Sequence, residues 1–176
     1  MPLQVEGKSG ERQEADADGR AYVVSRSIDE LAIIAREKGL SFSWSNVDYN
    51  YSAADTILAV ENNSPTRKLY ITKILAGGNT ASEVIVHVPT SNVTMAGTAV
   101  TGVCLNQANK EVAEATGIAD ETGNTQGSVV ARGRIAAAGN SLKLEVPVIL
   151  AQDQMIGVDF VTVGGAASVT IFGFFA

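Results

Sequence analysis

From Leu40 to its last residue, the chain alternates apolar and polar side chains with a period of two, as β-strands do. The alternating runs are short and are separated by turn residues, for example at residues 62–65, 77–79 and 139–141. Because one side of most runs is polar, we expect antiparallel sheets with one face in water. No helix-length segment lies between the runs, which disfavours a parallel sheet built from strand–helix–strand units.

About eight such runs predict an all-β fold: an antiparallel two-sheet sandwich of the jelly-roll type, with a closed barrel as the second choice. In one run, Ile71 and Leu75 are expected to share one face and Ile74 to lie on the other. Residues 99–105 are expected to form a single strand. Residues 106–126 are polar and are expected to form a long loop, and loops of this length usually carry function or are disordered.

The N-terminal residues are polar and interrupted by glycines, which predicts an arm or loop with one short strand before the first helix. Ser27 and Glu30 have the spacing of a capping box, in which each side chain bonds the amide of the other residue. Gly39 supplies the left-handed residue at which the helix is expected to end. The chain is therefore predicted to consist of an arm and capped helix over residues 1–39 and a sandwich body over residues 40–176.

Residues 155–176 are predicted to form two β-strands joined by a Gly-Gly turn. In the second strand Phe172 and Phe174 lie on one face and Phe175 on the other, so both faces are apolar near its end. A strand with two apolar faces must be covered twice. We expect Phe172, Phe174 and Phe175 to lie in an interface with a second copy of the chain, because edge strands need protection and closed oligomers are common.

The net charge of −6 argues against a nucleic-acid or anionic-membrane surface, because such surfaces need clustered lysine and arginine. No apolar run approaches the length of about 20 residues that crosses a membrane, and the N-terminus lacks the basic start and apolar core of a signal peptide. Cys104 is the only cysteine, so no disulfide within one chain is possible, and a buried, inert thiol is expected. These features predict a protein made and folded in a cytosol.

His87 is the only histidine, which limits the catalytic sites that the chain can form. On a strand, Glu83 would share its face but lie about 13 Å away at roughly 3.3 Å per residue, so the two are not a pair. No second histidine is present to hold a transition metal, and no pair of carboxylates suited to glycoside hydrolysis is evident. We therefore expect a structural His87, no enzymatic activity, no cofactor and no metal.

An aromatic cluster offers one alternative to a purely structural protein. Trp44, Tyr49 and Tyr51 lie near Asp48 in the sequence and have the composition of a sugar-binding platform. Packing between sheets or subunits is the competing explanation for the same rings. With such a platform, and with residues 106–126 as a recognition loop, the chain would be a receptor- or glycan-binding module.

Four groups of segments follow one another between residue 40 and the C-terminus. They are residues 42–45 (Phe-Ser-Trp-Ser) with 49–58, then 61–65 with 69–74, then 112–116 with 121–127, and finally 156–162 with 170–175. In style and order these segments resemble the capsid decoration proteins of tailed bacteriophages, also called cement or head-auxiliary proteins, which have a jelly-roll body.

The resemblance implies a structural component of the virion, located on the capsid exterior and made in the host cytoplasm. It implies a homotrimer that clamps adjacent subunits of the major capsid protein, and the charge of the chain predicts no nucleic-acid or membrane partner. The polar arm and helix would be the anchors on the capsid, with Val5, Arg12, Tyr22 and Leu31 as the expected contact residues. The alternative function is the receptor- or glycan-binding head of a phage fibre or tail.

Overall fold

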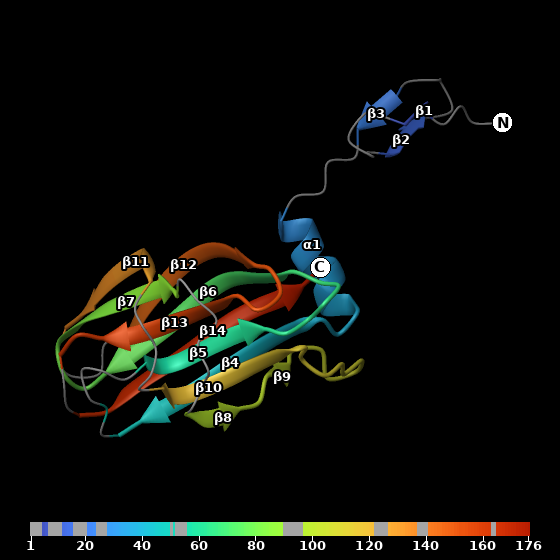
Figure 1. Ribbon diagram of the computed structural model, residues 1–176. Coiled ribbons are helices and arrows are strands. Elements are labelled where there is room, and N and C mark those ends of the chain that lie inside the picture. The colour runs from blue at the N-terminus through green and yellow to red at the C-terminus, as the bar shows by residue number, and fades with distance from the viewer. Residues whose placement is uncertain are drawn as a thin grey trace. The chain divides into compact units, whose positions relative to one another are not determined.

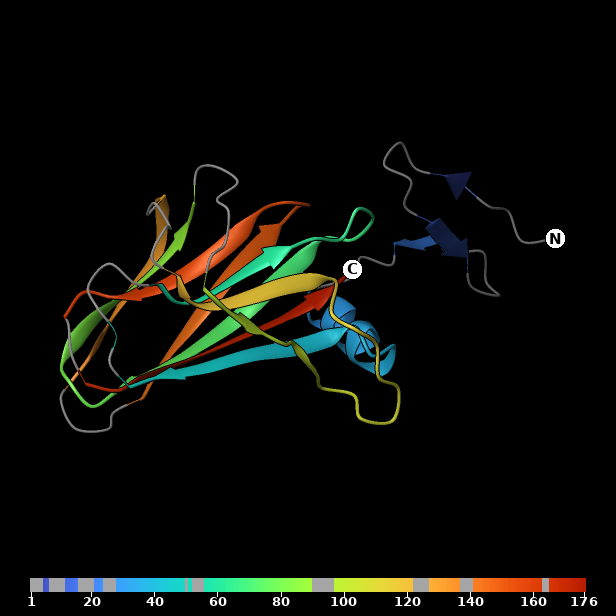
Figure 2. The same cartoon turned by 60° about the horizontal axis from the view of Figure 1, so that its bottom comes forward.

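A computed structural model of the chain describes residues 5–6, 12–15, 21–23, 28–49, 51, 56–89, 97–121, 127–136, 141–162 and 165–176. Contacts divide the chain into two units, Met1–Ile34 and Ala35–Ala176. The second unit contains two antiparallel sheets that pack face to face (Figure 1 and Figure 2).

The six-stranded sheet has the strand order β11, β7, β13, β5, β10, β8, and the five-stranded sheet has the order β12, β6, β14, β4, β9. The strands of the six-stranded sheet are β5 (Thr56–Asn62), β7 (Ser82–Val88), β8 (Thr98–Val100), β10 (Ala115–Glu121), β11 (Ser128–Ile135) and β13 (Met155–Phe160). Those of the five-stranded sheet are β4 (Ser41–Asp48), β6 (Leu69–Gly78), β9 (Val103–Cys104), β12 (Ser141–Leu150) and β14 (Ala167–Phe175).

Eight of these strands follow the course of a jelly roll. The order β12, β6, β14, β4 in one sheet opposes the order β11, β7, β13, β5 in the other. Two opposed sheets of four strands, connected in this way, make up the jelly-roll sandwich. The predicted fold class is therefore confirmed, and β8, β9 and β10 extend the two sheets beyond the eight strands that were expected.

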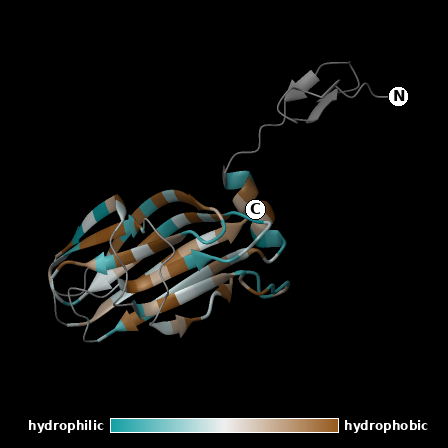
Figure 3. Ribbon diagram, viewed as in Figure 1, coloured by the Kyte–Doolittle hydropathy of each residue, from teal (hydrophilic) through white to brown (hydrophobic). Residues whose placement is uncertain are grey.

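The core lies between the two sheets and is filled by large apolar side chains. Phe42, Trp44, Ile57, Phe160 and Phe175 are each exposed by no more than 1%. The rings of Phe42 and Phe175 meet edge to face, with 5.8 Å between their centroids. Burying one side chain of this size contributes about 1.5–3 kcal/mol. Figure 3 shows hydrophobic residues interspersed with hydrophilic ones along the strands, as a two-layer fold requires.

A β-bulge in β6 changes which of its residues reach the core. Phe172 pairs with Lys73, and Gly173 pairs with Ile71, so the register between β14 and β6 shifts by one residue. The extra residue places Ile71 and Ile74 on the same face. Ile74 is fully buried, whereas Leu75 is 36% exposed. The expectation that Leu75 rather than Ile74 would share the face of Ile71 is therefore wrong, because strict alternation fails across a bulge.

Residues 106–126 are not the continuous loop that was predicted, because β10 lies within them and pairs with both β5 and β8. Small residues hid this strand from the sequence pattern. A Cβ atom added to Gly117 would lie 2.8 Å from Cδ1 of Trp44, so the indole leaves no room for a side chain there. The strand predicted over residues 99–105 divides into β8 and β9, which belong to different sheets. Gly102 lies between them, and a Cβ there would approach Trp44 Nε1 to 2.7 Å.

The N-terminal unit contains an antiparallel sheet of three short strands, β1 (Val5–Glu6), β2 (Arg12–Ala15) and β3 (Ala21–Val23), in the order β1, β2, β3. The single short strand expected before the helix corresponds to β3, whereas β1 and β2 were expected to be arm or loop. The contacts divide the chain at Ile34, within the helix, whereas the sequence pattern placed a boundary after Gly39.

The predicted helix is α1 (Ile28–Glu37), with Asp29 and Glu30 in its first turn, where carboxylates favour the positive end of the helix dipole. Ser27, the expected cap, lies outside the described residues. Gly39 has a φ of 75°, so it is the left-handed residue at which the helix ends, as predicted. Within the part of the chain that the structure describes, no helix is long and apolar enough to cross a membrane.

Candidate functional site

The predicted interface residues of the last strand are covered mainly by their own chain. β14 lies inside the five-stranded sheet, between β6 and β4, rather than at an edge. Phe175 belongs to the core, and Phe174 is 2% exposed and stacks on Tyr70 with 5.0 Å between centroids. The prediction that a second copy would cover Phe174 and Phe175 is therefore wrong. Phe172 is only half-buried, with Lys73 Nζ 4.2 Å from its ring centroid, and its role in an interface stays a prediction.

The aromatic residues predicted as a possible sugar platform do not form one. Trp44 is completely buried and Tyr51 is 2% exposed, while Tyr49 is 78% exposed. Tyr51 packs edge to face against Phe160 in the core, with 5.5 Å between centroids. A sugar can stack only on an accessible ring face, so the platform prediction is wrong, and packing between the sheets is the correct explanation for Trp44 and Tyr51. Burial also raises the pKa of the Tyr51 hydroxyl above its ordinary value, and the Asp48 carboxylate raises it further.

The predicted capsid-anchor residues lie on all three strands of the N-terminal sheet and on the helix. Val5 lies in β1, Arg12 in β2 and Tyr22 in β3, and Leu31 is half-buried in α1. In the backbone register Arg12 pairs with Glu6, and Tyr22 pairs with Glu14. The side chains of Val5, Arg12 and Tyr22 lie outside the described residues, so their anchor role stays a prediction.

The side chain of Asn106, which no sequence motif indicates, binds the C-terminal end of α1. Asn106 Nδ2 donates hydrogen bonds to the carbonyl oxygens of Arg36 and Glu37, both at 3.0 Å. Its Oδ1 accepts from the backbone amides of Ala108 and Asn109, at 3.0 and 3.1 Å. The last carbonyls of a helix have no partner within the helix, so Asn106 satisfies two of them from a distant loop.

Two further contacts fix this loop and the end of the helix to the sandwich. The amide of Leu105 donates to the carbonyl of Ser41 in β4 at 2.8 Å. The buried thiol of Cys104 lies 3.2 Å from the carbonyl oxygen of Gly39. The burial of Cys104 is as predicted. We name the contacts of Asn106, Leu105 and Cys104 the helix clasp, because together they hold the last residues of α1 against β4 and β9.

His87 of β7 contacts Asp159 of the neighbouring strand β13. Its Nε2 lies 3.0 Å from Oδ1 of Asp159, and the two residues are 0% and 5% exposed. They are diagonal neighbours on β7 and β13, because His87 pairs with Gly157 in the backbone register. A Cβ on Gly157 would lie 2.7 Å from His87 Nε2, so only glycine lets the ring lie across this strand.

The His87–Asp159 pair has the geometry of a structural contact. Within the described residues, His87 Nδ1 has no hydrogen-bond partner, and no group of side chains could hold a metal ion. His87 is fully buried, so a substrate cannot reach its ring without a rearrangement of the sheet. The expectations that His87 is structural and that Glu83 is not its partner agree with this geometry.

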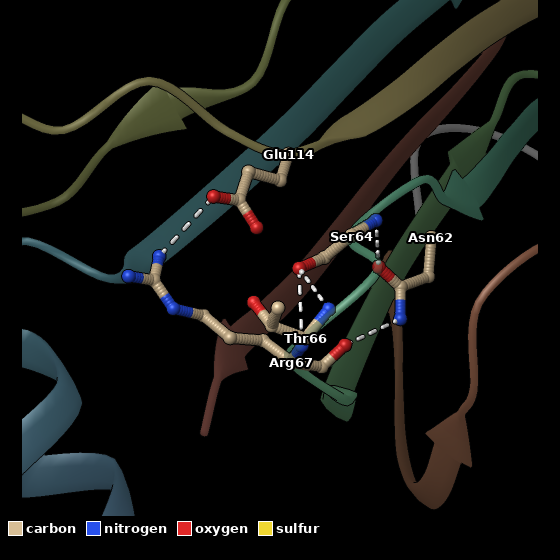
Figure 4. Close-up of polar contacts among 5 residues, drawn as sticks. All are labelled: Asn62, Ser64, Thr66, Arg67 and Glu114. Atoms are coloured by element: carbon tan, nitrogen blue, oxygen red, sulfur yellow. Dashed lines mark hydrogen bonds and ion pairs between the residues drawn. The ribbon is translucent and has the colours of Figure 1, made fainter.

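A third polar cluster lies in the turn between β5 and β6 (Figure 4). The completely buried Asn62 donates from Nδ2 to the carbonyls of Arg67 and Leu150, at 3.0 and 2.9 Å. Its Oδ1 accepts from the amide of Ser64 at 2.9 Å, and Ser64 Oγ accepts from the amide of Arg67 at 3.1 Å. Arg67 pairs with Glu114 across 3.5 Å. Asn62 thereby links the end of β5, in the six-stranded sheet, to the end of β12, in the five-stranded sheet.

Comparison of the chain with models of known protein families finds no match, and comparison with curated proteins also finds none.

Proposed function

We propose that this protein is a structural component of a tailed-bacteriophage virion that binds the assembled capsid and bridges adjacent subunits of the major capsid protein. The observation that carries the proposal is the helix clasp. It fixes Arg36 and Glu37, at the end of α1, to the loop that follows β9 in the sandwich, and Met1–Ile34 form a unit of their own. A helix end that is already ordered in the free protein lowers the entropic cost of binding a partner at that end.

The polar clusters of the sandwich favour a structural role for this part of the protein. Asn62, His87 with Asp159, and Asn106 bond within the chain, and each joins segments that are distant in sequence. The sandwich would therefore act as a rigid block that spans the gap between neighbouring capsid subunits. A protein that binds only the assembled lattice stabilises it by mass action, and many identical contacts add through avidity.

Self-association by extension of the two sandwich sheets is disfavoured, because their edge strands have features that prevent it. β12 has a bulge between Glu145 and Val148 that includes Pro147, and β11 has a bulge between Val129 and Ala131. β8 and β9, at the other two edges, have only three and two residues. The proposed homotrimer would therefore associate through sheet faces or loops, and light scattering would report a mass three times the 18.3 kDa of one chain.

Deletion of residues 1–26 tests the anchor role. The full chain is expected to sediment with DNA-filled capsids in a saturable ratio, and the truncated chain is expected to remain in solution. Emission of Trp44, which is the only tryptophan and is buried in the sandwich, reports whether the truncated body is folded. A folded truncated chain that binds capsids as well as the full chain would rule out the N-terminal unit as the anchor.

A further inference from the structure

A hollow of about 630 Å³ lies where β7 and β11 run side by side and β13 ends. Its walls include Ser82 and Glu83 from β7, Arg132 and Arg134 from β11, and Val161 and Thr162 beyond β13. Ligand sites commonly have volumes of about 300–1,000 Å³, so the hollow has room for a small organic group.

Hydrogen bonds fix the walls of this hollow. The amide of Val161 donates to the carbonyl of Glu83 at 3.0 Å, and the amide of Thr162 donates to Ser82 Oγ at 3.0 Å. Ser82 Oγ in turn donates to the carbonyl of Glu83 at 2.9 Å. The chain beyond β13 is therefore held against β7, which keeps the hollow open without a ligand.

The charges of the hollow are unevenly paired. Glu83 Oε1 lies 2.5 Å from Arg132 Nη1, and this ion pair occupies one guanidinium. Arg134 pairs with Glu83 in the backbone register, yet its side chain makes no hydrogen bond or ion pair with the rest of the described chain. Two arginines and one glutamate leave the hollow with a net charge of about +1 at neutral pH. This positive charge stands out in a chain whose net charge is −6.

We propose that this hollow binds a monocarboxylate that carries a short apolar stem. The guanidinium of Arg134 donates hydrogen bonds to both carboxylate oxygens, because its planar set of N–H groups matches the geometry of a carboxylate. The half-exposed Val161 contacts the stem. Arg132 and Glu83 form an ion pair beside the site, and the Glu83 carboxylate offsets one of the two positive charges.

The charge count favours a carboxylate over a phosphate group. A single negative charge balances the net charge of the hollow, whereas a phosphate monoester carries about −1.5 to −2 at neutral pH. The second charge of a phosphate would meet the carboxylate of Glu83, which is already present in the wall. The carboxylate can come from a free small acid or from a glutamate side chain of another protein, and both present the same chemistry.

Titrations followed by NMR chemical shifts of the full chain test the proposal. The probes are butyrate for a free acid, N-acetyl-glutamate amide for a glutamate side chain, N-acetyl-glutamine amide as the neutral analogue, and inorganic phosphate. Both carboxylates are expected to saturate shifts of the Thr162 amide, with phosphate weaker and the glutamine compound without effect. The tighter of the two carboxylates identifies the source.

Three variants assign the binding to the hollow. R134Q is expected to weaken carboxylate binding at least about tenfold, because the loss of a charge-assisted hydrogen bond lowers the affinity by about this factor. E83Q is expected to strengthen it, because the net charge rises and Arg132 is released. K143Q, which removes an exposed lysine on the other sheet, is the matched control and is expected to change affinity less than about twofold.

Three results would overturn the proposal: equal binding of the glutamine and glutamate compounds, tighter binding of phosphate than of either carboxylate, or equal effects of R134Q and K143Q. Arg134 is exposed, so its replacement is not expected to prevent folding, and Trp44 emission verifies this for each variant.

Discussion

Replacement of Asn62 by alanine is expected to destabilise the sandwich by about 3 kcal/mol. The side chain is completely buried and makes three hydrogen bonds, two donated to Arg67 and Leu150 and one accepted from Ser64. Each such bond contributes a net of about 1 kcal/mol, and a buried group left without its partner costs about 1–3 kcal/mol. The carbonyl of Leu150 would be such a group, because its bond to Asn62 is buried.

Asn63 provides a matched control, because it has the same side chain at the next position but is exposed. Its Oδ1 accepts from Thr116 Oγ, and N63A is expected to cost less than about 1 kcal/mol, as exposed contacts usually do. Guanidinium unfolding followed by Trp44 emission measures both variants, since this residue reports on the sandwich alone. Equal losses for N62A and N63A, or a loss below about 1 kcal/mol for N62A, would refute the argument that buried hydrogen bonding makes Asn62 structural.

Two further substitutions test other parts of the fold. G157A is expected to displace the His87 ring from Asp159 and to lower the free energy of unfolding by about 2 kcal/mol or more, because the added Cβ would lie 2.7 Å from Nε2. An unchanged unfolding midpoint together with unchanged imidazole NMR shifts would contradict this. Burial raises the pKa of Glu61 above its ordinary value, a hydrogen bond from Asn63 lowers it, and Asp153 raises it. The folded state therefore binds more protons than the unfolded state above the ordinary pKa, so the stability contribution of Glu61 falls as the pH rises through the folded pKa. E61Q is expected to remove this fall and to gain stability relative to the wild type between pH 4 and pH 7, and a stability difference that does not change with pH would count against it.

The strands of the eight-stranded jelly roll were largely predictable, because most have apolar residues on one face, β5 and β13 are short apolar runs, and turn residues separate them. β10 was not predictable, since the small residues that Trp44 requires on this strand, such as Gly117, give no apolar alternation. The burial of Ile74 depends on a bulge, and a single sequence does not show where an extra residue enters a strand.

The polar contacts were the least predictable part of the fold. His87 and Asp159 are 72 residues apart, and Asn106 is 70 residues from Arg36. No local spacing links such partners, so only the strand order brings them together. The prediction of an aromatic platform is wrong for a related reason. Trp44 shares the core face of β4 with Phe42, whereas Tyr49 lies beyond the end of that strand and is exposed.

The proposed role depends most directly on whether the protein distinguishes an assembled capsid from its free subunits. We would measure sedimentation of the full chain with DNA-filled capsids and, separately, with unassembled major capsid protein, together with the temperature at which the capsids release their DNA. The expected result is saturable binding to capsids only, with a higher release temperature. Absence of binding to capsids, or equal binding to free subunits with no change in release temperature, would contradict the proposed function.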